Sequence, residues 1–178
     1  MNNFLLALQF LTILPIRVNP APARMGLVKD AGEKNMAYAA AYFPLVGLLL
    51  GAILVLVNAL LGVLNIPLMT ANIILVVALL IITGGMHLDG LSDTADALLS
   101  GKSKDEMLSI MRDPHIGVMG TISIISILFL KITFLFSINP SLIPTALILI
   151  CVLSRWSLVF SLFLFPYARQ EGKAKVFT

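Results

Sequence analysis

The stretch AYAAAYFPLVGLLLGAILVLVNALLGVL, residues 37–64, runs for 28 residues without a charged side chain. At about 1.5 Å of rise per residue, a helix of that length is roughly 42 Å long and crosses a bilayer with some tilt. Three more apolar stretches follow it, at residues 68–83, 118–138 and 142–165. The sequence therefore predicts an all-α, polytopic membrane protein with about four spans, forming a single membrane-embedded domain over residues 1–178.

The composition supports a membrane location. Hydrophobic residues make up 59% of the chain and charged residues 12%, about half the charged share of a soluble domain. A soluble protein with this composition would lack the polar surface needed to face water. The single cysteine excludes a disulfide framework. The basic residues are scattered over short loops, so we expect the lipid bilayer, and not a nucleic acid, as the partner of this surface.

The first apolar run, residues 4–16, is 13 residues long. That is too short for an ordinary transmembrane helix. We expect an interfacial or re-entrant helix at this place.

The loop cations predict the orientation of the chain. The two short turns near Asn65 and Asn139 contain no Lys or Arg, and with four spans all the other loops lie on the opposite side. The positive-inside rule places that side in the cytoplasm, together with the polar segment at residues 84–117. The cations counted are Arg17, Arg24, Lys29, Lys34, Lys102, Lys104, Arg112, Arg169, Lys173 and Lys175.

Three aspartates in the polar segment are spaced four and three residues apart: Asp89, Asp93 and Asp96. On a helix with about 100° per residue they fall within an arc of about 60°. Three like charges on one face repel one another, and near a membrane they are costly. A divalent cation removes this cost, and Mg²⁺ prefers oxygen ligands while leaving positions for substrate phosphates. We predict a Mg²⁺ site for a pyrophosphate; the alternative is a solvated acidic face.

Cations elsewhere are candidates for binding phosphate. Arg112 follows a predicted short amphipathic helix that starts with a capping box at Ser103 and Glu106. Its planar guanidinium suits phosphate, although a surface cation that only sets topology remains the alternative. Arg155 lies well inside an apolar run, where cations usually face the protein interior, so we predict a phosphate or counter-ion role. Lys131 lies nearer the end of its run and is placed to snorkel.

The two histidines, His87 and His115, lack the partners of a zinc site. If the aspartate helix already includes His87, this side chain points away from the acidic face.

The stretch GGMHLDGLSDTADAL, residues 84–98, resembles the signature of the cobalamin synthase family, the adenosylcobinamide-GDP ribazoletransferases. Four other stretches resemble motifs of the same family in the same order, at residues 7–15, 42–47, 111–120 and 155–169. Members of this family usually continue through further hydrophobic segments, whereas this chain stops in a polar tail, which predicts a truncated product.

The resemblance implies a Mg²⁺-dependent transferase in a bacterial or archaeal cytoplasmic membrane. It would join adenosylcobinamide-GDP to α-ribazole or its 5′-phosphate, releasing GMP in the last step of cobalamin biosynthesis. The expected catalytic and metal-binding residues are Asp89, Asp93 and Asp96. The expected substrate-binding residues are His87, Arg112, Asp113 and Arg155.

Three other functions were compared with this one. A CDP-alcohol phosphotransferase has Ala-Arg soon after its first aspartates and a second acidic pair, and a prenyltransferase has two separate Asp-rich motifs; neither pattern is present. A transporter would use Lys131, Arg155 and the aspartates as an ion path, but it normally has a repeated half, which this sequence lacks. The oligomeric state, including a homo-oligomer, is left open by the sequence.

Overall fold

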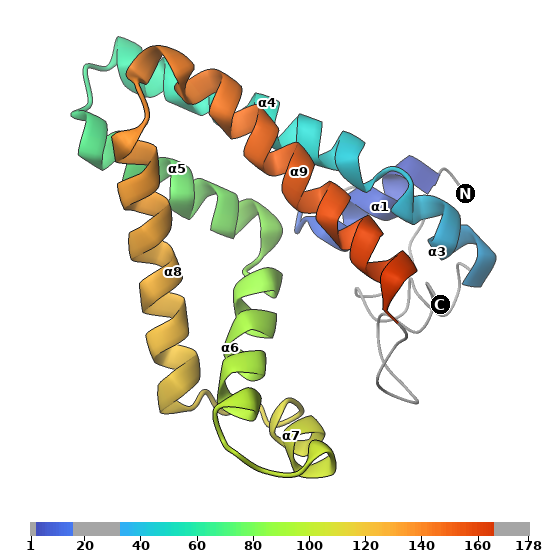
Figure 1. Cartoon of the computed structure of the whole chain (residues 1–178). Helices are drawn as coiled ribbons and strands as arrows, with labels where there is room; N and C mark the ends of the chain where they lie inside the picture. The colour runs from blue at the N-terminus through green and yellow to red at the C-terminus, as the bar shows by residue number, and fades with distance from the viewer. Residues whose placement is uncertain (1–2, 16–32, 166–178) are drawn as a thin grey trace. The chain divides into compact units, whose positions relative to one another are not determined.

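The computed structural model of the chain describes residues 3–15 and 33–165 (Figure 1). All the regular secondary structure in these two ranges is helical, which confirms the predicted all-α class. The predicted topology cations Arg17, Arg24, Lys29, Arg169, Lys173 and Lys175 lie outside the described residues. The helices are α1 (Asn3–Leu11), α3 (Glu33–Ala40), α4 (Phe43–Val63), α5 (Leu68–Thr83), α6 (Met86–Leu98), α7 (Lys104–Ile110), α8 (Val118–Ser137), the 3₁₀ turn η1 (Pro140–Leu142) and α9 (Ile143–Leu164).

Three helical stretches among the described residues are long and apolar enough to cross a membrane. They are α4, α8 and η1 with α9, with mean hydropathies of 2.6, 2.1 and 2.2. A fourth span exists if α5 and α6, which are bent by 90°, count as one. Three spans, or four with the bent pair, agree with the predicted number of about four. The chain is a multi-pass membrane protein.

The first predicted span begins later than expected. The helix does not run unbroken from residue 37, because α3 ends at Ala40 and a turn at residues 41–42 separates it from α4. Pro44 lies in the first turn of α4, where its missing N–H leaves no hydrogen bond unmade. The proline thus fixes a helix start inside a stretch whose hydrophobicity is continuous.

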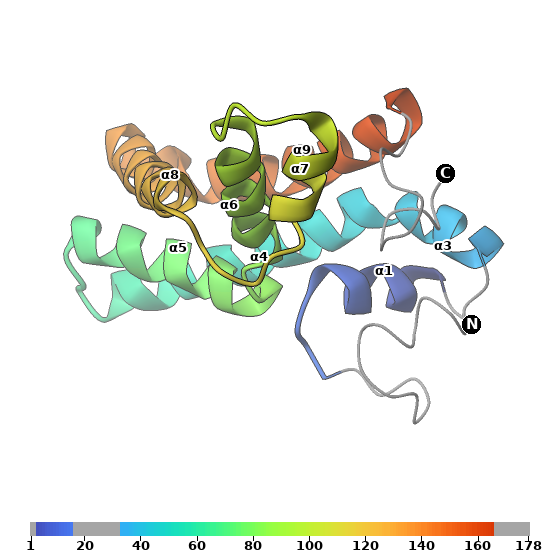
Figure 2. The same cartoon turned by 90° about the horizontal axis from the view of Figure 1, so that it is seen from below.

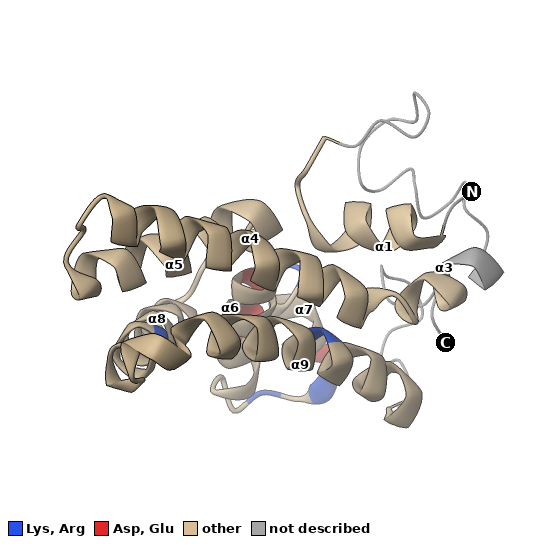
Figure 3. Cartoon of the chain, turned by 90° about the horizontal axis from the view of Figure 1, so that it is seen from above, with Lys and Arg blue, Asp and Glu red and all other residues tan. Residues whose placement is uncertain are grey.

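The helices form two compact units, and the first contains α1, α3, α4, η1 and α9. Helices α4 and α9 lie side by side in it (Figure 3). Gly47 and Gly51 of α4 face the backbone of α9: a Cβ at Gly47 would lie 2.9 Å from the Cα of Val152, and one at Gly51 would lie 2.7 Å from the Cα of Ile148. Small residues at this spacing let two membrane helices approach closely.

Helix α1 belongs to the same unit and packs against α3 and α4. Its residues Leu6, Ala7, Leu8 and Leu11 are buried, and Phe10 stacks on Phe43 of α4 with ring centroids 5.8 Å apart. With nine residues, α1 is too short to span a bilayer, as the length of the apolar run predicted. Whether it is interfacial or re-entrant stays a prediction.

The second unit contains α5, α6, α7 and α8. Helix α5 ends at Thr83, and Gly84 (φ 63°) and Gly85 (φ 68°) separate it from α6. Two successive residues in the left-handed region stop one helix and redirect the chain by 90°, a conformation that glycine adopts without steric cost. Helix α8 packs against both α5 and α6 (Figure 1 and Figure 2). The single-domain organisation over residues 1–178 stays a prediction.

Candidate active site on helices α6 and α8

All three aspartates of the predicted site lie on one continuous helix. Helix α6 runs from Met86 to Leu98, so the spacing of Asp89, Asp93 and Asp96 places them along one side of it. Asp89 is in the first turn, where the positive end of the helix dipole favours a carboxylate. Asp89 is exposed, whereas Asp93 and Asp96 are half-buried.

Asp96 connects α6 to α8. Its Oδ2 accepts a hydrogen bond from the backbone N–H of Gly117, and its Oδ1 accepts one from the N–H of Gly120, both at 2.8 Å. The first N–H groups of a helix have no partner within that helix, so a carboxylate from a neighbouring helix satisfies two of them here. We call this pair of hydrogen bonds the Asp96 cap.

The Asp96 cap depends on two glycines. A Cβ at Gly117 would overlap the carboxylate of Asp96, and a Cβ at Gly120 would overlap the same carboxylate and Ser92 Oγ. Ser92 is buried against this place, with 2% of its surface exposed. The sequence reasoning treated Asp96 only as a metal ligand and missed the cap. The signal available was the pair Gly117 and Gly120, placed at the start of an apolar helix.

The carboxylates of Asp89 and Asp93 fit Mg²⁺ by their chemistry. Both are oxygen donors, they are one helical turn apart, and Mg²⁺ is commonly bound by one or two carboxylates together with water and substrate phosphates. Among the described residues, no three His, Cys, Asp or Glu side chains form a group suited to hold a metal ion. The Mg²⁺ site and its three ligands therefore stay a prediction.

The connection from α6 to α8 contains α7 and the residues around Arg112. The predicted capping box is confirmed: the backbone N–H and the hydroxyl of Ser103 both donate to Glu106 Oε2, at 3.1 and 2.6 Å. These two hydrogen bonds hold the pKa of the Glu106 carboxyl below its ordinary value. Arg112 follows α7 and is exposed.

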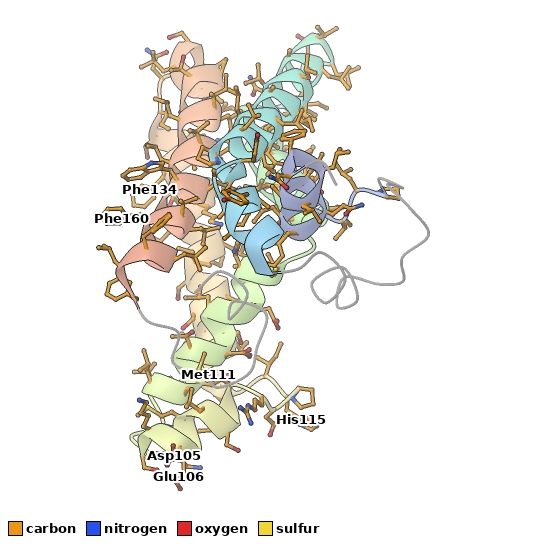
Figure 4. The ribbon with its side chains drawn as sticks, turned by 90° about the vertical axis from the view of Figure 1, so that its right-hand side faces the viewer. Asp105, Glu106, Met111, His115, Phe134 and Phe160 are labelled. Atoms are coloured by element: carbon orange, nitrogen blue, oxygen red, sulfur yellow. The ribbon has the colours of Figure 1, made fainter. Side chains whose placement is uncertain are left out.

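Asp113 is engaged by a neighbour in the chain. Its Oδ1 accepts the backbone N–H of His115 at 2.9 Å and contacts Nδ1 of the same histidine at 2.5 Å. The backbone and side-chain hydrogen bonds from His115 hold the pKa of Asp113 below its ordinary value. Figure 4 shows His115 on the chain that leads into α8. The predicted substrate contact of Asp113 would compete with this local pairing.

The remaining predicted residues lie apart from the acidic face of α6. His87 is exposed on α6, about 160° around the helix from Asp89, which confirms that it points away from the acidic face. Arg155 lies on α9 in the first unit and is only 4% exposed, which confirms that this cation faces the protein interior. Its Nη1 donates to Ser154 Oγ at 2.8 Å, and its buried Nε has no hydrogen-bond partner among the described residues. Lys131 is exposed on α8.

Comparison with known proteins identifies the family. Residues 3–178 match the family model described as cobalamin-5-phosphate synthase. The chain belongs to the cobalamin-5-phosphate synthase family. This confirms the family resemblance inferred from the stretch at residues 84–98.

Curated proteins with sequences similar to this chain are named adenosylcobinamide-GDP ribazoletransferase. The protein from Desulforamulus reducens is 38% identical over 96% of this chain and 64% of its own length. That from Roseiflexus sp. is 41% identical over 96% of this chain and 60% of its own length. The chain thus spans less than two thirds of the length of these relatives. No solved structure matches it.

Proposed function

We propose that the chain is an adenosylcobinamide-GDP ribazoletransferase. A free ribose hydroxyl of α-ribazole, or of α-ribazole 5′-phosphate, attacks the phosphate attached to adenosylcobinamide and loses its proton as the new P–O bond forms. The bond from that phosphate to GMP breaks, so GMP leaves and adenosylcobalamin or its phosphate forms. The observation that carries this proposal is the similarity, over nearly the whole chain, to relatives that bear this name.

In this proposal the carboxylates bind the metal ion and the guanidinium groups bind phosphate. Asp89 and Asp93 would hold Mg²⁺, which neutralises charge on the pyrophosphate as the bond to GMP breaks. Arg112 and Arg155 would bind phosphate oxygens, because a guanidinium donates two parallel N–H groups in a fixed geometry. The buried Nε of Arg155 has no hydrogen-bond partner among the described residues, which supports a role in binding an anion. Phosphoryl transfer requires mostly positioning and charge neutralisation, so few other groups are needed.

The proposed location is a bacterial or archaeal cytoplasmic membrane, with residues 84–117 facing the cytoplasm. The absence of Lys and Arg from the turns near Asn65 and Asn139 supports this orientation. A cytoplasmic site would give access to nucleotide-activated substrates.

The decisive experiment uses the full chain in membrane vesicles. Adenosylcobinamide-GDP and α-ribazole are added with and without Mg²⁺, and both released GMP and the corrinoid product are quantified. We expect Mg²⁺-dependent formation of both products in equal amounts. If neither product forms at any Mg²⁺ concentration, the proposed function is wrong.

The metal assignment has its own matched set of variants. Asp89→Asn and Asp93→Asn keep the shape of the side chain and remove its charge, so each should raise the Mg²⁺ concentration that gives half-maximal activity. The control is Asp105→Asn, the same substitution at an exposed acid of α7 outside the acidic face. Unchanged Mg²⁺ dependence in both test variants would contradict the assignment.

A further inference from the structure

Both carboxylate oxygens of Asp96 already have hydrogen-bond donors within the protein. Each of its carboxylate oxygens accepts one backbone N–H at 2.8 Å, and both N–H groups belong to the start of α8. Hydrogen bonds to an ionised acceptor are roughly twice as strong as neutral ones, and the N-terminal end of a helix carries partial positive charge. Asp96 therefore has a structural partner that spacing along α6 did not reveal.

Helix geometry separates Asp96 from Asp89. Seven residues of rise place their Cα atoms about 10 Å apart along the axis, whereas Asp89 and Asp93 are about 6 Å apart. Two oxygens bound to one Mg²⁺ at about 2.0–2.1 Å lie no more than about 4.2 Å from each other. Asp89 and Asp93 would have to lean together across one turn to reach this separation. Asp96 would have to abandon its hydrogen bonds to α8 in order to lean toward Asp89.

Two glycines allow the close approach of Asp96 to the start of α8. Only a residue without a Cβ fits at Gly117 or Gly120 while Asp96 keeps its position. The carbonyl oxygen of Ser92 also lies within 3.0 Å of where a Cβ at Gly120 would be, so backbone as well as side chain limits the space. Gly117 is also the last residue of the connection that contains Arg112.

We propose that Asp96 is a positioning residue and not a metal ligand: by capping α8 it fixes the connection that contains Arg112 relative to the acidic face of α6. The metal-holding carboxylates are then Asp89 and Asp93 alone. This inference rests on the proposed function for its catalytic consequence, but the cap and the metal assignment are measurable without turnover.

The first test measures metal binding in the absence of substrate. Mn²⁺, a spectroscopic substitute for Mg²⁺, is titrated into the purified full chain and its bound fraction followed by electron paramagnetic resonance. We expect Asp89→Asn and Asp93→Asn each to weaken binding at least tenfold, and Asp96→Asn to change it less than twofold. Weakening in Asp96→Asn equal to that in Asp89→Asn would overturn the inference. A wild-type chain that binds no Mn²⁺ would overturn the metal assignment itself.

The second test measures the cap by amide hydrogen exchange over residues 117–121 without metal. Asp96→Asn replaces one acceptor with an NH₂ group, and Gly120→Ala displaces Asp96 without altering any carboxylate, so both should speed exchange at least tenfold. Gly62→Ala is the control, because a Cβ added at this helical glycine would have nothing within 4 Å. Unchanged exchange in Gly120→Ala would overturn the cap. Should Asp96→Asn fail to fold, Gly120→Ala alone decides.

The third test links the cap to Arg112. In the transferase assay, Asp96→Asn and Arg112→Lys should each raise the KM for adenosylcobinamide-GDP. The KM of the double variant should be no higher than that of the poorer single variant, because both substitutions disturb the same contact of Arg112 with the substrate. Independent effects, which would multiply, would contradict positioning through Arg112. If the wild-type chain releases no GMP, the proposed function has failed, whereas the exchange and metal-binding results still decide the role of Asp96.

Discussion

Replacement of Gly47 by alanine tests the contact between α4 and α9. The new Cβ would lie 2.9 Å from the Cα of Val152 and closer still to the carbonyl oxygen of Cys151, whereas ordinary contacts begin at 3.4 Å. Both neighbours are backbone atoms, so the two helices must separate by at least about 0.5 Å. A gap of that size forfeits a quarter or more of each neighbouring dispersion contact. Overpacking of this kind costs about 1–3 kcal/mol.

The expected result is a melting temperature lower by about 2–12 °C for a chain of this size. Cys151 is the single cysteine and is buried, so a thiol-reactive dye reports unfolding in detergent, and fluorescence of the single tryptophan, Trp156, provides a second probe. Gly62→Ala is the control. Gly51→Ala should also destabilise, and the double variant should cost less than the sum because one separation relieves both overlaps. If Gly47→Ala melts at the same temperature as Gly62→Ala, the reasoning is refuted.

Three further results are expected. Arg155→Lys keeps the charge but loses the planar donor pair, so it should lower GMP release about tenfold or more. Arg155→Ala should lower GMP release as well, and both variants should still insert into the membrane. Wild-type activity in Arg155→Lys would contradict a phosphate contact. Cysteines placed at Ser103 and Asn139 should label from opposite sides of the membrane, and labelling from one side would disprove the orientation. The pKa of Glu106 is lowered from 4.5, so the α7 cap is present above that pH and is lost as the pH falls through the lowered pKa. Exchange of α7 amides, corrected for intrinsic rates, should therefore rise at low pH in the wild type and vary little in Glu106→Gln.

Local features of the fold followed from the sequence. The apolar lengths indicated the spans, the spacing of Asp89, Asp93 and Asp96 indicated one helical face, and the pair Ser103 and Glu106 indicated the start of α7. Each of these depends on residues within a few positions of one another. Hydrophobicity, helical periodicity and capping act over that range, so a linear pattern is enough to predict them. Even so, the start of α4 at Phe43 was missed, because hydrophobicity is continuous across the turn before it.

Only the tertiary structure decided which groups meet across the chain. Asp96 accepts hydrogen bonds from residues 21 and 24 positions away, and Gly47 lies against the backbone at Cys151. Spacing along α6 reports which side chains share a face, but it carries no information about what another helix places opposite that face. For Asp96 the structure adds two hydrogen bonds from the N–H groups of α8, which the spacing along α6 did not reveal. The physical reason is that a carboxylate accepts hydrogen bonds from the donors that packing brings next to it, and those donors come from another helix.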